Sequence, residues 1–177
     1  MKLKSIIFLI IIVAAVYFFY WNLDFKAANQ KLNALDEKYL NGVIPVQEKS
    51  SEYKTAMGLL KNEFAFRGPS AEKNAIMALI DMRLKTIELL DAQKALDSKY
   101  KLLNTLNLDC DSIYYADFTS AFDSLESDLE AIAKMAAKFE KDFSAYEDDA
   151  YVKALKDSME GMKQGIENQK QIINEEC

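Results

Sequence analysis

The feature that most constrains this chain is a run of 19 residues near its amino terminus, residues 5–23, that carries no charge. Residues 6–20 contain no strongly polar side chain at all. As a helix, the run spans roughly 28 Å at about 1.5 Å per residue, which is close to the hydrocarbon thickness of a bilayer. The run predicts a transmembrane helix, because a soluble helix of this length would need a polar face.

The two ends of this run differ in chemistry. Lys2 and Lys4 put positive charge before it, and the positive-inside rule keeps such an end in the cytoplasm. Amphipathic rings stand at its far end, where they favour the lipid headgroup region. These predicted interface residues are Tyr17, Tyr20 and Trp21.

This pattern predicts a single-pass protein of the cell membrane with two parts. Residues 1–23 form a cytoplasmic stub and a transmembrane signal-anchor, and residues 24–177 form an extracytoplasmic helical domain. A cleaved signal peptide is the alternative. It is disfavoured because the apolar run ends in bulky residues, and its one passable cleavage site, Val13-x-Ala15, lies inside the run.

Beyond the anchor the sequence is typical of long amphipathic helices. Half of the chain is hydrophobic, and it has only two prolines and five glycines, which argues against disorder and against a many-stranded β fold. Apolar residues recur at steps of three and four. We expect the anchor to continue as one helix to about Leu40, a left-handed glycine at Gly42, and a second helix opening at Pro45.

Three further helices are expected. The break at residues 67–69 predicts a helix over 70–106, whose apolar face is wide in its first half and narrow in its second. A regular stripe from Tyr115 to Tyr146 predicts the next helix, and a stripe from Val152 to Ile173 predicts the last. The two stripes are out of phase, so we expect a turn near residues 147–149. The predicted fold is all-α, with an antiparallel bundle or elongated coiled-coil hairpin after the anchor.

Charge and composition exclude several function classes. All 28 acidic residues follow the apolar run, so the extracytoplasmic part is acidic and nucleic-acid binding is not expected. The chain has no histidine, which removes the commonest general base and metal ligand. We therefore predict no enzyme activity, no cofactor and no metal site.

Two motifs have ordinary alternatives. Asn107-x-Asp109-x-Asp111 resembles the start of a calcium loop, but Ser112 and Phe118 stand where that loop needs a glycine and a carboxylate, so a turn is favoured. Gly161-x-x-x-Gly165 lies in a stripe of small residues. Two glycines within a helix cost about 1 kcal/mol each relative to alanine, so we predict close approach of a neighbouring helix there.

The only two cysteines are Cys110 and Cys177. On the outer side of a membrane an even pair usually oxidises, so a disulfide is expected. If the last two helices form a hairpin turning near residues 147–148, Cys177 faces Phe118, about 12 Å along the helix from Cys110. The bond is reachable if the tail and the 107–111 turn adjust, and an intermolecular link through Cys177 remains open.

The layout resembles that of LemA-like proteins and phage inner-membrane spanins, in architecture alone. We predict a membrane-anchored tether or scaffold that contacts the lipid bilayer and binds a protein partner, or itself, through helix faces. The alternative is a sensor or binding bundle for a small ligand or cation. Its ligand pocket would be lined by four apolar side chains of the last two helices. These are Phe118, Phe122, Met159 and Met162.

Overall fold

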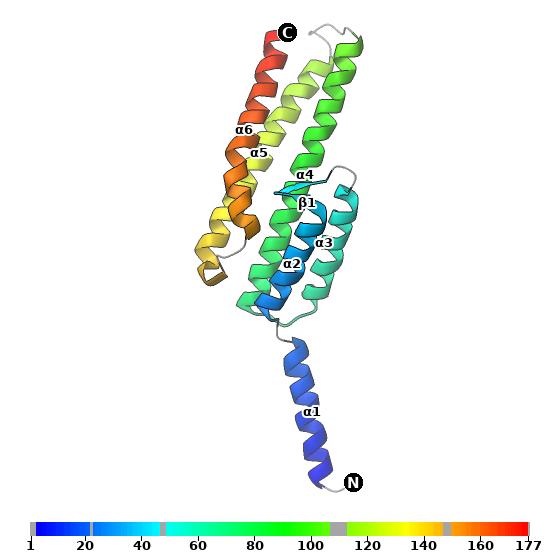
Figure 1. The fold of residues 1–177 in the computed structure, drawn as a ribbon, viewed down its shortest axis with the longest axis vertical. Coiled ribbons are helices and arrows are strands. Elements are labelled where there is room, and N and C mark those ends of the chain that lie inside the picture. Colours follow the sequence, from blue (N-terminus) through cyan, green and yellow to red (C-terminus); the bar gives the residue numbers. More distant parts are fainter. Residues whose placement is uncertain (1–2, 22, 47–48, 107–112, 147–149, 177) are drawn as a thin grey trace.

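A computed structural model describes residues 3–21, 23–46, 49–106, 113–146 and 150–176 (Figure 1). Within these residues the chain forms six α-helices, a short hairpin and one 3-10 turn. The helices are α1 (Leu3–Trp21), α2 (Phe25–Tyr39), α3 (Ser50–Ala65), α4 (Ala71–Leu106), α5 (Ile113–Asp142) and α6 (Ala150–Glu176). The hairpin strands are β1 (Leu40–Asn41) and β2 (Ile44–Pro45), and the 3-10 turn is η1 (Ser144–Tyr146). The all-helical bundle predicted from the sequence is confirmed.

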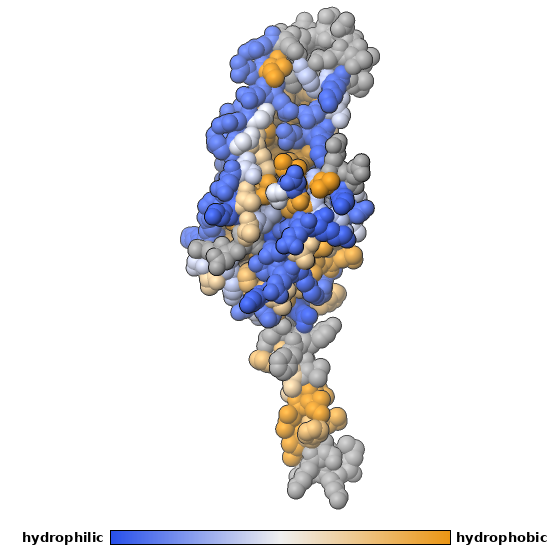
Figure 2. Space-filling view, in the orientation of Figure 1, coloured by the Kyte–Doolittle hydropathy of each residue, from blue (hydrophilic) through white to orange (hydrophobic). Residues whose placement is uncertain are grey.

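Helix α1 projects from one end of the bundle (Figure 1). We call this end the base; it contains the start of α2, the α3–α4 turn and η1. Where their side chains are described, residues 7–15, 17 and 18 of α1 are all exposed, and Figure 2 shows an apolar column there. Among the residues that the structure describes, no helix combines the length and the apolar character needed to cross a membrane.

Helix α1 ends at Trp21 and a separate helix, α2, begins at Phe25, so the predicted continuous helix to Leu40 is wrong. Asp24 has an extended backbone, and its carboxylate accepts hydrogen bonds from the backbone N–H groups of Lys26 at 2.9 Å and Ala27 at 3.3 Å. An aspartate in this position satisfies N–H donors that have no partner in the first turn of a helix. The apolar stripe continues through this point, which is why its periodicity concealed the break.

The segment after α2 is a small antiparallel hairpin. Leu40 pairs with Pro45 and Asn41 with Ile44, and Gly42 makes the turn with a φ of 67°. The left-handed glycine was predicted correctly. Pro45, however, lies in a strand, and the next helix begins only at Ser50, so its predicted role as the first residue of a helix is wrong.

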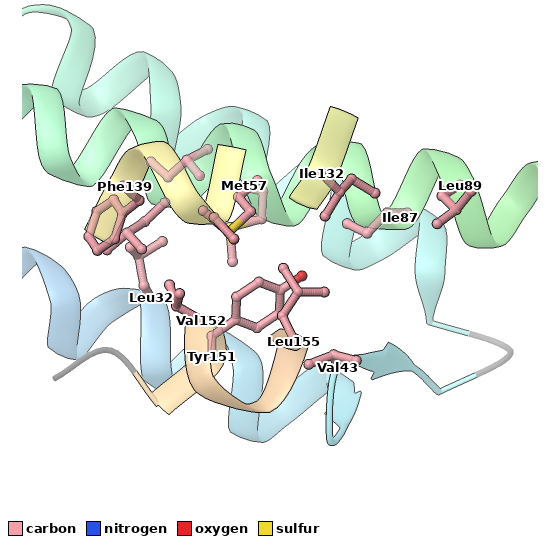
Figure 3. Packing of buried hydrophobic residues seen from close by; sticks show 14 of the residues in the cluster. Leu32, Val43, Met57, Ile87, Leu89, Ile132, Phe139, Tyr151, Val152 and Leu155 are labelled. Atoms are coloured by element: carbon pink, nitrogen blue, oxygen red, sulfur yellow. The ribbon is translucent and has the colours of Figure 1, made fainter. Parts of the chain in front are cut away.

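Helix α4 is the central element of the bundle. It packs against α2 and α3 along its first half and against α5 along its length. Its second half also meets α6, where Gln169 donates a hydrogen bond to Asp97, so the narrow apolar face there does not mean a single partner. Its buried residues include Ile76, Leu79, Ile80 and Ile87. Figure 3 shows side chains of α2, α4, α5 and α6 converging in this core.

Helices α5 and α6 form the predicted antiparallel hairpin. Lys156 on α6 pairs with Glu140 on α5 at 2.6 Å, and Lys170 pairs with Glu126 at 3.2 Å. These pairs have the register expected from a turn near residues 147–148. Beyond the β1–β2 hairpin, α4, α5 and α6 continue to the distal end of the bundle (Figure 1).

Candidate functional site

A buried ion pair joins α2 to α4 inside the bundle. Arg83 of α4 is completely buried, and its guanidinium lies against the carboxylate of Asp36 on α2. The Nε atom of Arg83 donates to Oδ1 of Asp36 at 3.1 Å and to Oδ2 at 3.0 Å, and Nη2 donates to Oδ2 at 2.7 Å. Nη1 donates to the carbonyl oxygen of Leu79 at 3.2 Å. This fork-to-carboxylate geometry is the strong form of a charge-assisted hydrogen bond.

Two tyrosines extend this pair to two more helices. The Tyr53 hydroxyl on α3 donates to Oδ1 of Asp36 at 2.5 Å, and the Tyr151 ring on α6 lies 4.2 Å from the Arg83 guanidinium carbon. Burial raises the pKa of Tyr53 above its usual range, and the neighbouring charge of Asp36 raises it further. Figure 3 shows Tyr151 among buried apolar side chains. Residues 36, 53, 83 and 151, which we call the four-helix cluster, therefore connect α2, α3, α4 and α6.

The side chains of the four-helix cluster are suited to holding helices together. The charges of Asp36 and Arg83 are paired, the Tyr53 hydroxyl is kept protonated, and the guanidinium is always charged. Such a pair is strongly destabilising to break from one side only, because the remaining charge stays buried. The arrangement thus holds four helices in one relative position, and its residues offer no activated nucleophile.

The sequence contained an unread signal for this cluster. Arg83 lies four residues after Leu79 and four before Ile87, on the apolar face of α4, and Asp36 lies four residues after Leu32 on that of α2. Opposite charges on the buried faces of two helices predict that they pair, because neither is stable alone in the interior.

The predicted interface residues fall on or near α1. Tyr17 is 59% exposed. Lys4, Tyr20 and Trp21 lie within the helix, but their side chains are outside the described residues, and Lys2 is outside them altogether. The structure thus places one of these five side chains in the solvent-facing column of α1.

The prediction of close helix packing at Gly161 and Gly165 is wrong within this chain. A Cβ atom added at either position would meet no heavy atom within 4 Å. Gly161 is exposed and Gly165 is half-buried, whereas the buried seam of α6 runs through Val152, Leu155 and Ile166. A stripe of small residues beside the buried seam therefore does not by itself predict that another helix packs closely against it.

Three predicted features lie outside the described residues. They are the Cys110–Cys177 disulfide and the two acidic turns at residues 107–111 and 147–149. In the remainder of the chain, which the structure does describe, no group of three or more His, Cys, Asp or Glu side chains could hold a metal ion.

Two of the four residues predicted to line a ligand pocket, Phe122 and Met159, line separate hollows. Phe122 lines a cavity of about 230 Å³ between α4, α5 and α6, together with Leu96, Tyr100 and Gln169. Met159 lines a separate, open groove between α5 and α6. In the cavity, Gln169 donates to Asp97 at 2.6 Å, and its buried Oε1 has no hydrogen-bond partner in the described part of the chain.

Comparison with known proteins gives no relative from which a function could be transferred. No protein-family model, no curated protein and no solved structure matches this chain. Any functional conclusion therefore depends on the residues themselves.

Proposed function

We propose that the protein is a membrane-anchored helical tether or scaffold, non-enzymatic, whose bundle stands outside the cytoplasm and binds a protein partner or another copy through its helix faces. The observation that carries this proposal is the contrast between α1 and the bundle. The large apolar side chains described on α1 are between 42% and 66% exposed, whereas the apolar residues that form the core of the bundle are exposed to 8% or less.

The exposed column on α1 requires an apolar environment. Ile10, Ile11 and Phe18 are 60%, 58% and 64% exposed, and neighbouring apolar residues are similar. Each such side chain gains about 1.5–3 kcal/mol on full burial, so the column as a whole favours transfer out of water by more than about 10 kcal/mol. The uncharged run in the sequence, residues 5–23, extends beyond the described side chains at both ends and is long enough for a bilayer.

The bundle has the properties of a rigid spacer. The four-helix cluster fixes α2, α3, α4 and α6 together, and α4 and α6 extend to the distal end. Its outer surface is rich in charged residues, as Figure 2 shows, and many of them are paired across helices. A surface of this kind suits recognition by another folded surface rather than chemistry on a small substrate.

Membrane retention and topology test the anchor. After carbonate washing, the full-length chain should remain in the membrane fraction, and residues 24–177 should be cut by protease added outside spheroplasts. Ile10→Lys combined with Ile11→Lys should release the protein, since each central lysine costs about 2.5–3.5 kcal/mol on insertion scales. The matched control is Ile172→Lys, at a 47% exposed position on α6, which should stay in the membrane. Retention of the double lysine variant would refute the anchor.

Affinity purification from native membranes tests the tether. A protein that co-purifies with the full-length chain, and fails to do so when charged residues on one helix face are reversed, would support it. Recovery of the chain alone and monomeric, under conditions that preserve other membrane complexes, would contradict it.

A second candidate function rests on the 230 Å³ cavity. Its walls are apolar apart from the Asp97–Gln169 pair, and the unpartnered Oε1 of Gln169 could accept a hydrogen bond from a small molecule. A ligand-dependent rise in melting temperature without any protein partner would favour this reading. The rise should disappear in Gln169→Leu if the amide takes part.

A further inference from the structure

We propose that the base of the bundle lies directly on the lipid headgroups, with the exposed ring of Phe66 inserted among them. This inference rests on the proposed membrane anchoring by α1. It adds a second lipid contact, made by the folded bundle itself, and it predicts that the bundle is seated on the membrane rather than held away from it.

The first argument is the length of the connection. Helix α1 ends at Trp21 and α2 begins at Phe25, and Asp24 already caps α2 through its side chain. A fully extended chain covers at most about 14 Å between residues 21 and 25. The headgroup layer on each side of a bilayer is about 5–8 Å thick. A bundle attached this closely has its base in or beside that layer.

The second argument is the side chain found at that end. Phe66, in the turn that joins α3 to α4, is 80% exposed, and Leu59, two helical turns earlier on α3, is 67% exposed. Both values are higher than those of the large apolar residues described on α1. Figure 2 shows apolar atoms on the flank of the bundle where α3 lies, next to the emerging anchor.

The turn that carries Phe66 is held by hydrogen bonds. The Lys73 ammonium donates to the carbonyl oxygens of Ala65 and Arg67, at 2.7 Å each. The hydroxyl of Ser70 accepts from the Lys73 backbone N–H at 3.1 Å, and the Arg67 N–H donates to the carbonyl of Phe64 at 3.0 Å. The phenyl ring is thus presented outward by an ordered turn on both sides of it.

Other side chains of the base suit a headgroup environment. The rings of Phe25 and Tyr146 lie 4.3 Å apart, and the Tyr146 pKa is raised by partial desolvation and by its hydrogen bond to Glu72. Tyr146 has the apolar ring and polar hydroxyl of the residues that concentrate at membrane interfaces.

Charge complementarity does not drive this contact. The residues around the base carry both signs, with Lys26 and Arg67 beside Asp24 and Glu72. The attraction therefore comes from apolar burial and should be similar on zwitterionic and anionic bilayers. Because α1 enters the bilayer at this same end, the bilayer, and not a second copy or a soluble partner, is the surface that Phe66 meets.

Tryptophan fluorescence in vesicles tests the contact. The chain has a single tryptophan, Trp21, so Trp21→Phe gives a silent background in which Phe66→Trp is the only reporter. The full-length protein is placed in phosphatidylcholine vesicles with and without a nitroxide on the headgroup. The matched control carries Ile172→Trp, which is exposed on α6 toward the distal end. Circular dichroism verifies that both variants keep their helix content.

Headgroup nitroxide should quench the tryptophan at position 66 several-fold more strongly than the one at position 172. Equal, weak quenching in protein that floats with the vesicles would refute the seated base and leave the anchor intact. Protection of position 66 from acrylamide without quenching by lipid would assign the face to protein contact and also refute the inference. Protein that does not float would overturn both this inference and the proposed anchor.

Discussion

Removing one partner of the Asp36–Arg83 pair should destabilise the bundle more than any surface change. The substitution Asp36→Asn keeps the shape of the side chain and removes its charge. Arg83 has no exposed surface, and three of its hydrogen bonds go to the two oxygens of this carboxylate. The variant leaves a guanidinium charge in the interior without its counter-ion.

The size of the effect follows from the burial of the two groups. Breaking a buried ion pair from one side destabilises proteins by about 3–5 kcal/mol. The Asp36 side chain is 15% exposed, so some water reaches it, and the lower end, about 3 kcal/mol, is expected. For a chain of this size, that loss lowers the melting temperature by about 6–12 °C.

Thermal unfolding of the full-length protein in detergent, followed by far-UV circular dichroism, measures this. The control is Lys54→Met, which breaks the Lys54–Glu88 pair between α3 and α4 at 3.6 Å, where both side chains are about half exposed. Its effect should be below about 1 kcal/mol. The double variant Asp36→Leu with Arg83→Met should recover part of the lost stability, since no charge is left buried and only the Tyr53 hydroxyl loses its acceptor. In that variant, amide hydrogen exchange in α2 should nevertheless be faster than in the parent.

Two results would refute this reasoning. If the unfolding free energy of Asp36→Asn lies within about 1 kcal/mol of that of the parent, breaking this pair is no more harmful than breaking an exposed pair, and the cluster does not hold the helices together. If the double variant is as unstable as the single one, the loss comes from altered packing at the site and not from an unpaired charge.

Four further substitutions should have defined effects. Gly161→Ala and Gly165→Ala should each raise stability by about 0.5–1 kcal/mol in urea denaturation, because the space around both is open; a loss would mean that another chain packs there. Ile132→Ala should lower it by about 2–5 kcal/mol, since Ile132 is fully buried, and a negligible loss would place that seam outside the core. The pKa of Tyr53 is raised in the folded state, so the stability that its hydroxyl contributes is complete below about pH 10 and is lost as pH rises further. Tyr53→Phe should therefore flatten the decline of the unfolding free energy above pH 10. Parallel plots of unfolding free energy against pH for the parent and the variant would contradict this.

The helical hairpin was predictable because two independent patterns agreed. The stripes of α5 and α6 each keep helical periodicity, and the phase difference between them predicted that the helix ends and turns back; the Lys156–Glu140 pair confirms that α5 and α6 run antiparallel. The break between α1 and α2 was missed for the opposite reason. Apolar periodicity passes through Asp24 unchanged, and the termination depends on two backbone hydrogen bonds to one carboxylate. Periodicity reports which face is buried and says little about where a helix is capped.

The candidate site was missed because charged residues were treated as surface residues. Arg83 and Asp36 occupy positions where the apolar stripes of their helices require a buried side chain. Each charge alone contradicts its stripe, and only their pairing across helices resolves the contradiction. Tyr53 could not be assigned in this way, since a buried tyrosine needs no charged partner, and its bond to Asp36 depends on the tertiary arrangement.

The position of the ion pair in the fold explains why an interior charge would be useful in the proposed tether. Helix α2 is the first element after α1, so any force on α1 reaches the bundle through it. The apolar contacts of Ala28 and Leu32 could be exchanged for similar ones if α2 slid by one turn, about 5.4 Å. The Asp36–Arg83 bonds could not, because their geometry is directional and their loss would leave two unpaired charges inside. An apolar pair would give similar stability but would not distinguish the native position of α2 from one shifted by a turn. The ion pair thus fixes the register of α2, the helix that connects the bundle to α1. This explanation requires that amide hydrogen exchange in α2 be faster in the double variant than in the parent.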